Sequence, residues 1–189
     1  YEEKNKGERT EEGHKHEYYR FMKPKNSDFP FQIELFSRNI GLINFPTDAH
    51  ISPIPMDEDL SSLSAILMDD DYYRFTIEHS RTEDGIHIAN VESLICLKCR
   101  AFLEMTERKK NGESVDSKHI AKHKKDVFRL AGMLAPSDKY DVPATLRADI
   151  ENFCKAVEMD LPNKDFLSAA GLNNISGMEL LSQLKQTFL

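Results

Sequence analysis

Residues 85–134 constrain the fold more than any other stretch, because two long helices are predicted there in close succession. A short strand at 86–89 leads into a helix predicted at 91–109. A polar turn at 110–117 separates it from a second helix predicted at 118–135. In both helical stretches apolar side chains recur every three or four residues, which places them on one face of an α-helix.

The first of these helices carries an unexpected lysine. Its predicted apolar face comprises Val91, Leu94, Ile95, Ala101, Phe102 and Met105, and its polar face Glu92, Ser93, Arg100, Glu104 and Glu107. Lys98 falls near the middle of the apolar face, where a buried, unpaired ammonium would cost several kcal/mol or shift its pKa. Lys98 therefore lies over apolar neighbours with its charge at the edge of the core, pairs with a carboxylate, or reaches an anionic ligand. These alternatives stay open at this point. Asn90 is the expected N-cap.

Composition sets outer bounds on the fold and on the partners. A chain of 189 residues is long enough for one good core or two small lobes. The net charge of −7 argues against a general nucleic-acid-binding surface but leaves room for a local basic patch. No apolar run approaches the length of a membrane span and no secretory leader is recognisable, so a cytoplasmic protein without membrane partners is expected.

The three cysteines are best interpreted as core residues. Cys96 and Cys99 are three apart inside a predicted helix, and Cys154 stands alone. Without a second Cys pair, this spacing is a poor zinc site. A redox pair is the alternative interpretation.

The N-terminal half is predicted to be rich in strands. Residues 1–15 are highly charged and expected to be loosely ordered, and the missing initiator methionine suggests a fragment or a processed piece. Residues 17–23 and 31–37 are predicted to pair as a hairpin. In the second strand Glu34 is the only carboxylate, so it lies on a solvated sheet face or serves as a metal-facing or base-type carboxylate.

The middle of the chain gives mixed signals. A short helix is predicted at 59–68, and the three aspartates at 69–71 are interpreted as a solvated turn. Residues 72–79 are aromatic and β-branched, which predicts a strand paired with 86–89.

The second long helix carries two possible binding rows. His119, His123 and Asp126 have a spacing that can bind a metal, although no further ligand is evident nearby. Lys122, Lys125 and Arg129 share a basic face that either meets phosphates or is simply solvated.

The C-terminal part is predicted to be helical at 144–159, 163–171 and 176–188. In the first of these helices the side chains expected to point inward are Leu146, Ile150, Phe153, Cys154 and Val157. In the last helix the apolar residues at helical spacing are Met178, Leu181, Leu184 and Phe188. The fold class is therefore α+β, with an N-terminal antiparallel or mixed sheet followed by a C-terminal helical bundle. The expected limits are a charged segment at 1–15, a sheet-rich domain at 16–90 and a helical domain at 91–189.

The stretch IHIANVESLICLKCRAFLEMTERK, followed by HIAKHKKDVFRL, resembles the helical region of AbiEii-type nucleotidyltransferases, in the DNA polymerase β-like superfamily. The matching positions are Lys98, Arg100, Ala101 and the pair Lys125-Asp126. The strand FQIELFS is similar to the family strand that supplies a third active-site carboxylate, here Glu34. The sheet would then be part of a nucleotidyltransferase palm.

The resemblance implies roles for these residues. Glu34 would be a catalytic, metal-binding carboxylate, and Lys98 a catalytic lysine that binds the triphosphate together with Lys125 and Arg129. Asp126 would be a supporting or base-type carboxylate. The implied cofactors are Mg²⁺ and a nucleoside triphosphate, and the implied partners are an RNA or protein acceptor and a cognate antitoxin-type protein.

The sequence departs from the family at the catalytic motif. The Gly-Ser turn followed by paired aspartates, which holds the metal ions in the family, does not occur in these residues. The chain alone is therefore expected to be inactive, and to transfer a nucleotidyl group only if an upstream half completes it. The alternative is a non-catalytic binding or regulatory module of the same fold, in a toxin–antitoxin or defence setting.

Overall fold

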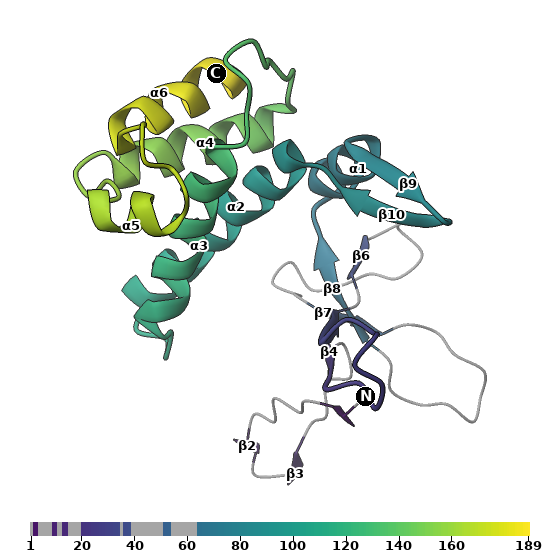
Figure 1. Ribbon diagram of the computed structural model, residues 1–189. Helices are drawn as coiled ribbons and strands as arrows, with labels where there is room; N and C mark the ends of the chain where they lie inside the picture. The colour runs from purple at the N-terminus through teal and green to yellow at the C-terminus, as the bar shows by residue number, and fades with distance from the viewer. Residues whose placement is uncertain are drawn as a thin grey trace. The chain divides into compact units, whose positions relative to one another are not determined.

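The computed structural model describes residues 2–3, 9–10, 13–14, 20–34, 36–38, 51–53 and 64–189. The chain divides into two compact units, unit 1 (Tyr1–Tyr73) and unit 2 (Arg74–Leu189). Strands and helices both occur, so the predicted α+β class is confirmed (Figure 1). The finer interpretation as a partial palm, and the predicted domain limits, stay predictions.

The described strands of unit 1 form small sheets. One has the order β1-β4-β5 and is antiparallel, with β1 Glu2–Glu3, β4 Arg20–Met22 and β5 Gln32–Glu34. Another has the order β6-β8-β7, with β6 Phe36–Arg38, β7 Ile51–Pro53 and β8 Ser64–Met68. The pair β2 (Arg9–Thr10) and β3 (Gly13–His14) is antiparallel.

The predicted first hairpin is confirmed by the pairing of β4 with β5. Phe21 lies opposite Ile33, and the backbone amide of Lys23 donates to the carbonyl of Phe31 at 2.9 Å. The second strand of this hairpin is shorter than the sequence predicts. Within the predicted run 31–37, β5 and β6 belong to different sheets.

Two predictions for the middle of the chain were wrong. The stretch 64–68, predicted as the end of a short helix, is strand β8, which pairs on both sides with β6 and β7; residues 59–63 lie outside the described residues. The predicted strand at 72–79 is instead helix α1, Asp70–Glu78. The aspartates interpreted as a turn start this helix. The side chain of Asp69 accepts from the amide of Asp71 at 3.0 Å, and acidic residues in a first turn favour the helix dipole.

The strand predicted at 86–89 is confirmed as β10, Ile86–Ala89, but its partner is β9, Ser80–Glu83. Asp84 and Gly85 connect the two strands and have φ angles of 49° and 78°. Positive φ at both central residues is what a tight hairpin turn requires, and glycine adopts it without strain.

The hairpin is fastened to the following helix through His79. The hydroxyl of Ser93 donates to the carbonyl oxygen of His79 at 2.8 Å, and His79 Nδ1 lies 3.1 Å from Glu92 Oε1. Glu92 and Ser93, assigned by the sequence to the face with Arg100 and Glu104, are buried at the start of α2. Their hydrogen bonds make burial tolerable. Asn90 occupies the N-cap position, but its side chain forms no cap hydrogen bond.

After the β9–β10 hairpin, unit 2 continues as a helical bundle with a flanking short helix. The helices are α2 Val91–Lys110, α3 Ser117–Ala131, α4 Ala144–Val157, α5 Lys164–Ala169 and α6 Gly177–Phe188. Helix α2 packs against α3 and α4, and α6 packs against the same two helices (Figure 1). The largest fully buried side chains are Phe128, Phe153, Phe188, Ile95, Leu146, Ile150, Leu180, Leu181, Leu184, Val127 and Val157.

The predicted C-terminal helices are confirmed, with small corrections. Helix α3 ends at Ala131 rather than at residue 135, and Gly132 follows as its C-cap. Met178 has the helical spacing of the buried residues of α6 but is 57 % exposed, in the first turn of the helix between the capping-box residues Ser176 and Glu179. The inward positions Leu146, Ile150, Phe153, Cys154, Val157, Leu181, Leu184 and Phe188 are all buried.

Candidate functional site

Lys98 and Asp126 meet where α2 packs against α3. The ammonium nitrogen of Lys98 lies 3.7 Å from Asp126 Oδ2. The two side chains are 32 % and 18 % exposed, so the pair sits at the edge of the core, in contact with water. Three alternatives were open for Lys98, and the structure shows the second, pairing with a carboxylate, that of Asp126.

Asp126 contacts a second cation on its own helix. A guanidinium nitrogen of Arg129 donates to Asp126 Oδ1 at 3.2 Å. One carboxylate therefore holds an ammonium from α2 and a guanidinium from α3 with its two oxygens. The result is a small cationic cluster of net charge +1 on the surface of an acidic chain.

His123 lies one helical turn before this cluster and adds no charge near neutral pH. Its Nδ1 atom is buried and has no hydrogen-bond partner among the described residues. Burial lowers the pKa of His123, the ammonium of Lys98 lowers it further, and the carboxylate of Asp126 opposes both. The imidazole is therefore neutral at pH 7, and the positive charge comes from Lys98 and Arg129.

The possible metal row on α3 finds no support. Among the described residues, no group of three or more His, Cys, Asp or Glu side chains could hold a metal ion. His119, His123 and Asp126 therefore do not form such a group. Glu34 lies in β5 of unit 1, opposite Arg20 in the strand register, whereas Lys98 belongs to unit 2. The side chain of Glu34 lies outside the described residues, so its predicted metal-binding role stays a prediction.

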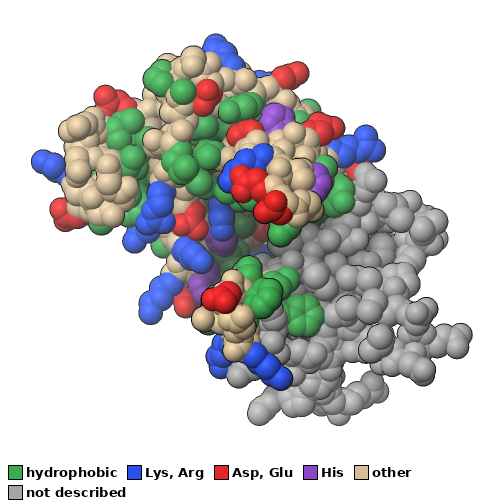
Figure 2. Space-filling view, turned by 45° about the vertical axis from the view of Figure 1, so that its right-hand side comes forward, with side chains coloured by type: hydrophobic (Ala, Val, Ile, Leu, Met, Phe, Trp, Pro, Cys, Tyr) green, Lys and Arg blue, Asp and Glu red, His purple; other side chains and the backbone are tan. Residues whose placement is uncertain are grey.

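The predicted basic face of α3 is present and longer than expected. Its exposed members are Lys118, Lys122, Lys125 and Arg129. Positions four, seven and eleven residues after the first lie on one side of an α-helix. Lys125 and Arg129 also lie beside the ring of Phe166 from α5, each 5.7 Å from its centroid. In Figure 2, Lys and Arg side chains gather along the left and lower edge of the described atoms.

The cysteines are core residues, as predicted. Cys96, Cys99 and Cys154 are free thiols and are all buried. Burial raises the pKa of Cys96 to about 12 and that of Cys154 to about 11, and it raises the pKa of Cys99 as well. Thiols protonated this strongly are poor nucleophiles and poor metal ligands, which favours the interpretation as core residues over that of a redox pair.

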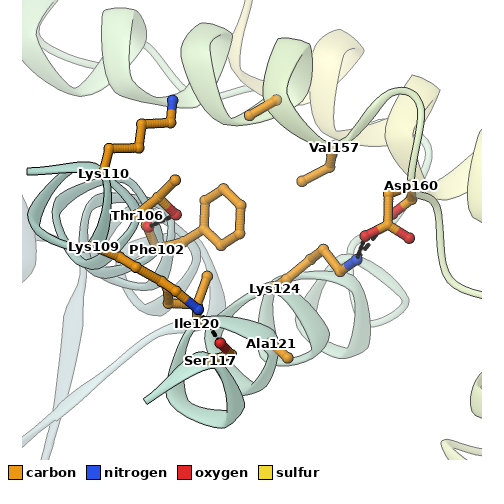
Figure 3. Close-up of a pocket in the computed structure, with 11 residues that line it drawn as sticks. Phe102, Thr106, Lys109, Lys110, Ser117, Ile120, Ala121, Lys124, Val157 and Asp160 are labelled. Carbon is orange, nitrogen blue, oxygen red and sulfur yellow. Dashed lines mark hydrogen bonds and ion pairs between the residues drawn. The ribbon is translucent and has the colours of Figure 1, made fainter. Parts of the chain in front are cut away.

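Sequence reasoning missed a second group of lysines. Lys110 and Lys124 line a pocket between α2, α3 and α4, together with Lys109 (Figure 3). The basic residues in the last turn of α2 are of the kind commonly found at a helix C-terminus, where they interact favourably with the helix dipole. Only the packing of α4 against α2 gives these lysines an apolar pocket to surround.

No protein-family model matches the chain, and the curated proteins contain no match. The solved structures contain no match either. None of the described helices is long and apolar enough to cross a membrane.

Proposed function

We propose that unit 2 binds the phosphates of a nucleoside triphosphate at Lys98, in a nucleotidyltransferase-like protein that transfers the nucleotidyl group to an RNA or protein acceptor. The observation that carries the proposal is the cluster of Lys98, Asp126 and Arg129. An ammonium and a guanidinium from two helices offer charge-assisted hydrogen bonds to phosphate oxygens. Positive charge placed there would also offset charge on the leaving pyrophosphate.

Asp126 acts as the positioning residue in this proposal. It holds the cationic ends of Lys98 and Arg129 close together before any ligand binds. Lys98 is partly exposed and its contact with Asp126 is long, so its ammonium can turn toward a phosphate in solvent. Asp126 meanwhile keeps Arg129 in place. Lys125 extends the same surface along α3.

Mg²⁺ is implied by the family resemblance, but the described residues do not fit a site for it. No cluster of three or more potential ligands occurs among them. No step is therefore assigned to a metal held by this chain. The chemistry proposed for its own residues is binding and orientation of the triphosphate, with Mg²⁺ arriving as the counterion of the nucleotide.

An RNA acceptor is favoured over a protein acceptor by the basic face of α3. Lys118, Lys122, Lys125 and Arg129 extend over three turns, roughly 16 Å, which is enough to meet successive phosphates of one strand. Phe166 beside Lys125 and Arg129 adds an aromatic ring of the kind on which bases stack.

A non-catalytic binding or regulatory module, in a toxin–antitoxin or defence setting, is the second candidate. The observation that favours it is the pairing of Lys98 with Asp126 itself. An ion pair between neighbouring helices can serve packing alone, with no ligand. In that case the basic face would bind a partner, such as an antitoxin-type protein, without any nucleotide.

Calorimetric titration with ATP, GTP, CTP and UTP in the presence of Mg²⁺ tests the proposal. Lys98→Ala should abolish binding, and Glu34→Ala tests the implied carboxylate. The matched control is Lys155→Ala, an exposed lysine of α4 paired with Glu151 at 2.9 Å. Nucleotide binding that survives Lys98→Ala contradicts the proposal. If the chain binds no nucleotide but does bind RNA or a protein partner, the non-catalytic module is the better interpretation.

A further inference from the structure

A pocket of about 530 Å³ lies between the C-terminal half of α2, the N-terminal half of α3 and the end of α4. Lys109, on its rim, is eleven residues after Lys98 along α2, or roughly 16 Å at the usual helical rise. Lys124, also in the lining, is only two positions before Asp126, but two positions correspond to about 200° around an α-helix. Since none of Lys98, Asp126 and Arg129 lines the pocket, it is separate from their cluster. Its volume falls within the range of about 300–1,000 Å³ that is typical of small-molecule sites.

The inner surface of the pocket is apolar. Phe102 and Val157 are core residues, 8 % and 1 % exposed, and the ring of Phe102 faces Val157 across the space (Figure 3). Ile120, Ala121 and Ala156 complete this surface. An aromatic ring or an acyl chain placed there would lie against apolar side chains and lose contact with water on that side.

The rim of the pocket is cationic. Lys109 donates to the hydroxyl of Ser117, and Lys124 pairs with Asp160 (Figure 3). Lys110 has no ion-pair partner within the described part of the chain. The lining thus holds three ammonium groups and one carboxylate, in a chain whose net charge is −7. Such a local excess of positive charge favours an anionic ligand.

Lys124 is built into the wall of the pocket rather than displayed on the surface. Its side chain is 16 % exposed, whereas that of its partner Asp160 is 81 % exposed. An exposed carboxylate loses little when it turns out into water, because water replaces the lost contact. The ammonium of Lys124 also donates to the carbonyl oxygen of Asp160 at 3.0 Å, which holds it at the pocket when the carboxylate turns away. A ligand anion entering the pocket would then take the place of the carboxylate.

We propose that this pocket binds a small amphiphilic anion. The apolar body, an aromatic ring system or a short acyl chain, lies against Phe102 and Val157. The head group, a carboxylate, sulfonate or phosphate, pairs with Lys124 at one end of the pocket, and the ammonium of Lys110 at the opposite end adds longer-range attraction (Figure 3). A polymer is disfavoured, because its backbone would need a continuous basic track and this pocket has an apolar floor.

Fluorescence titration with anilinonaphthalene sulfonate tests the proposal, since this dye joins an aromatic body to one anionic group. Its neutral counterpart, N-phenylnaphthylamine, lacks the sulfonate and measures what charge contributes. Lys124→Met and Lys110→Met keep an apolar stem and remove the ammonium. Lys124→Met should weaken binding of the sulfonate about tenfold, as expected for loss of one charged hydrogen-bond donor. Lys110→Met should weaken it by less, because its charge acts from the opposite end of the pocket, and both variants should leave the neutral dye unchanged.

Two matched variants locate the effect. Lys155→Met removes an exposed lysine of α4 outside the pocket, and Lys98→Met removes the lysine of the proposed nucleotide site. Both should bind the sulfonate as the unmodified chain does, so failure of the nucleotide proposal leaves this one untouched. Because Lys124 is partly buried, circular dichroism checks its variant, and the exposed Lys110 gives an independent readout.

Three outcomes overturn the proposal. One is the absence of saturable dye binding to the unmodified chain. Another is equal affinity in Lys110→Met and in the unmodified chain. The third is binding of the neutral dye as tight as that of the sulfonate, which would show that the lysines do not contribute to affinity.

Discussion

The ammonium of Lys98 and the carboxylate of Asp126 lie 3.7 Å apart, on two helices that follow one another in the chain. The contact ties the middle of α2 to the last two turns of α3. It also explains how a lysine is tolerated beside the buried residues Ile95, Cys99 and Phe102. The proposed nucleotide site depends on this one relationship.

The Lys98–Asp126 pair should contribute a small but measurable coupling energy. In a double-mutant cycle of Lys98→Met and Asp126→Asn, urea unfolding is expected to give about 0.5 kcal/mol, because the pair is partly solvated and its contact is long. A coupling energy of zero would mean that the two side chains do not interact in solution. The exposed pair Lys155–Glu151 provides the comparison.

Acid should destabilise the fold through His123. Its pKa is lowered from the ordinary value of 6.5, first by burial and then by Lys98, so the unfolded chain takes up the proton more readily. Its contribution to stability is thus unchanged above about pH 7 and falls as pH drops through 6.5 and below. His123→Gln should flatten the pH dependence of the unfolding free energy between pH 7 and 5, whereas the exposed His119→Gln should not. A larger acid sensitivity in His123→Gln would contradict this account.

Lys98 should also be visible in the titration of His123. Because the ammonium lowers the pKa of His123, Lys98→Met is expected to raise that pKa toward 6.5. Proton NMR of the imidazole resonances measures it directly. The matched change Lys155→Met, far along the chain on α4, should leave the titration where it was.

Phe153 should be among the most costly side chains to truncate. It is fully buried, and its ring packs edge-on to Phe102 and tilted against Phe128, with centroids 5.2 Å and 6.2 Å away. Phe153→Ala is expected to lower the unfolding free energy by about 3–5 kcal/mol. Met178→Ala, at a position 57 % exposed, should change it by less than about 0.5 kcal/mol. Similar losses for the two variants would argue against this core.

The turn of the β9–β10 hairpin should require glycine at one position only. Gly85 has φ of 78°, so Gly85→Ala is expected to destabilise the fold by about 1 kcal/mol. Asp84→Asn should be nearly neutral, since asparagine tolerates the φ of 49° found at that position. Thermal unfolding of both variants measures the difference.

The three thiols should be inert in the folded protein. Cys96 and Cys154, with pKa values of about 12 and 11, are protonated and inaccessible at pH 8. A thiol reagent such as dithionitrobenzoate is therefore expected to react with none of the three until denaturant is added. Rapid reaction of one thiol in native buffer would show that this part of the core opens.

The sequence by itself determined the helices of unit 2. The spacing of Leu146, Ile150 and Phe153 requires one helical face, and Pro143 and Pro162 bracket α4 and the turn after it. The hairpin residues Asp84 and Gly85 likewise specify a turn through their backbone preferences. Local rules suffice wherever the period of the apolar residues and the cap residues agree.

Where local sequence preferences conflict, the secondary structure is determined by tertiary contacts. The aromatic run at 72–79 has strand propensity, yet the aspartate cap at Asp69 and the burial of Tyr72 and Phe75 on one face make it helical. Residues 64–68 were predicted as the end of a helix but pair on both sides as β8. Strand pairing joins residues distant in sequence, so no local pattern encodes it.

The candidate sites show the same division. The sequence alone picked out Lys98 as an anomaly, Asp126 as a member of a possible metal-binding row and Arg129 as a member of a basic helix face. That Asp126 is the partner of Lys98 depends on how α2 packs along α3, since the helices meet through side chains 28 positions apart. The pocket around Lys110 and Lys124 needed α4 as its third wall, because isolated helices have faces but no pockets.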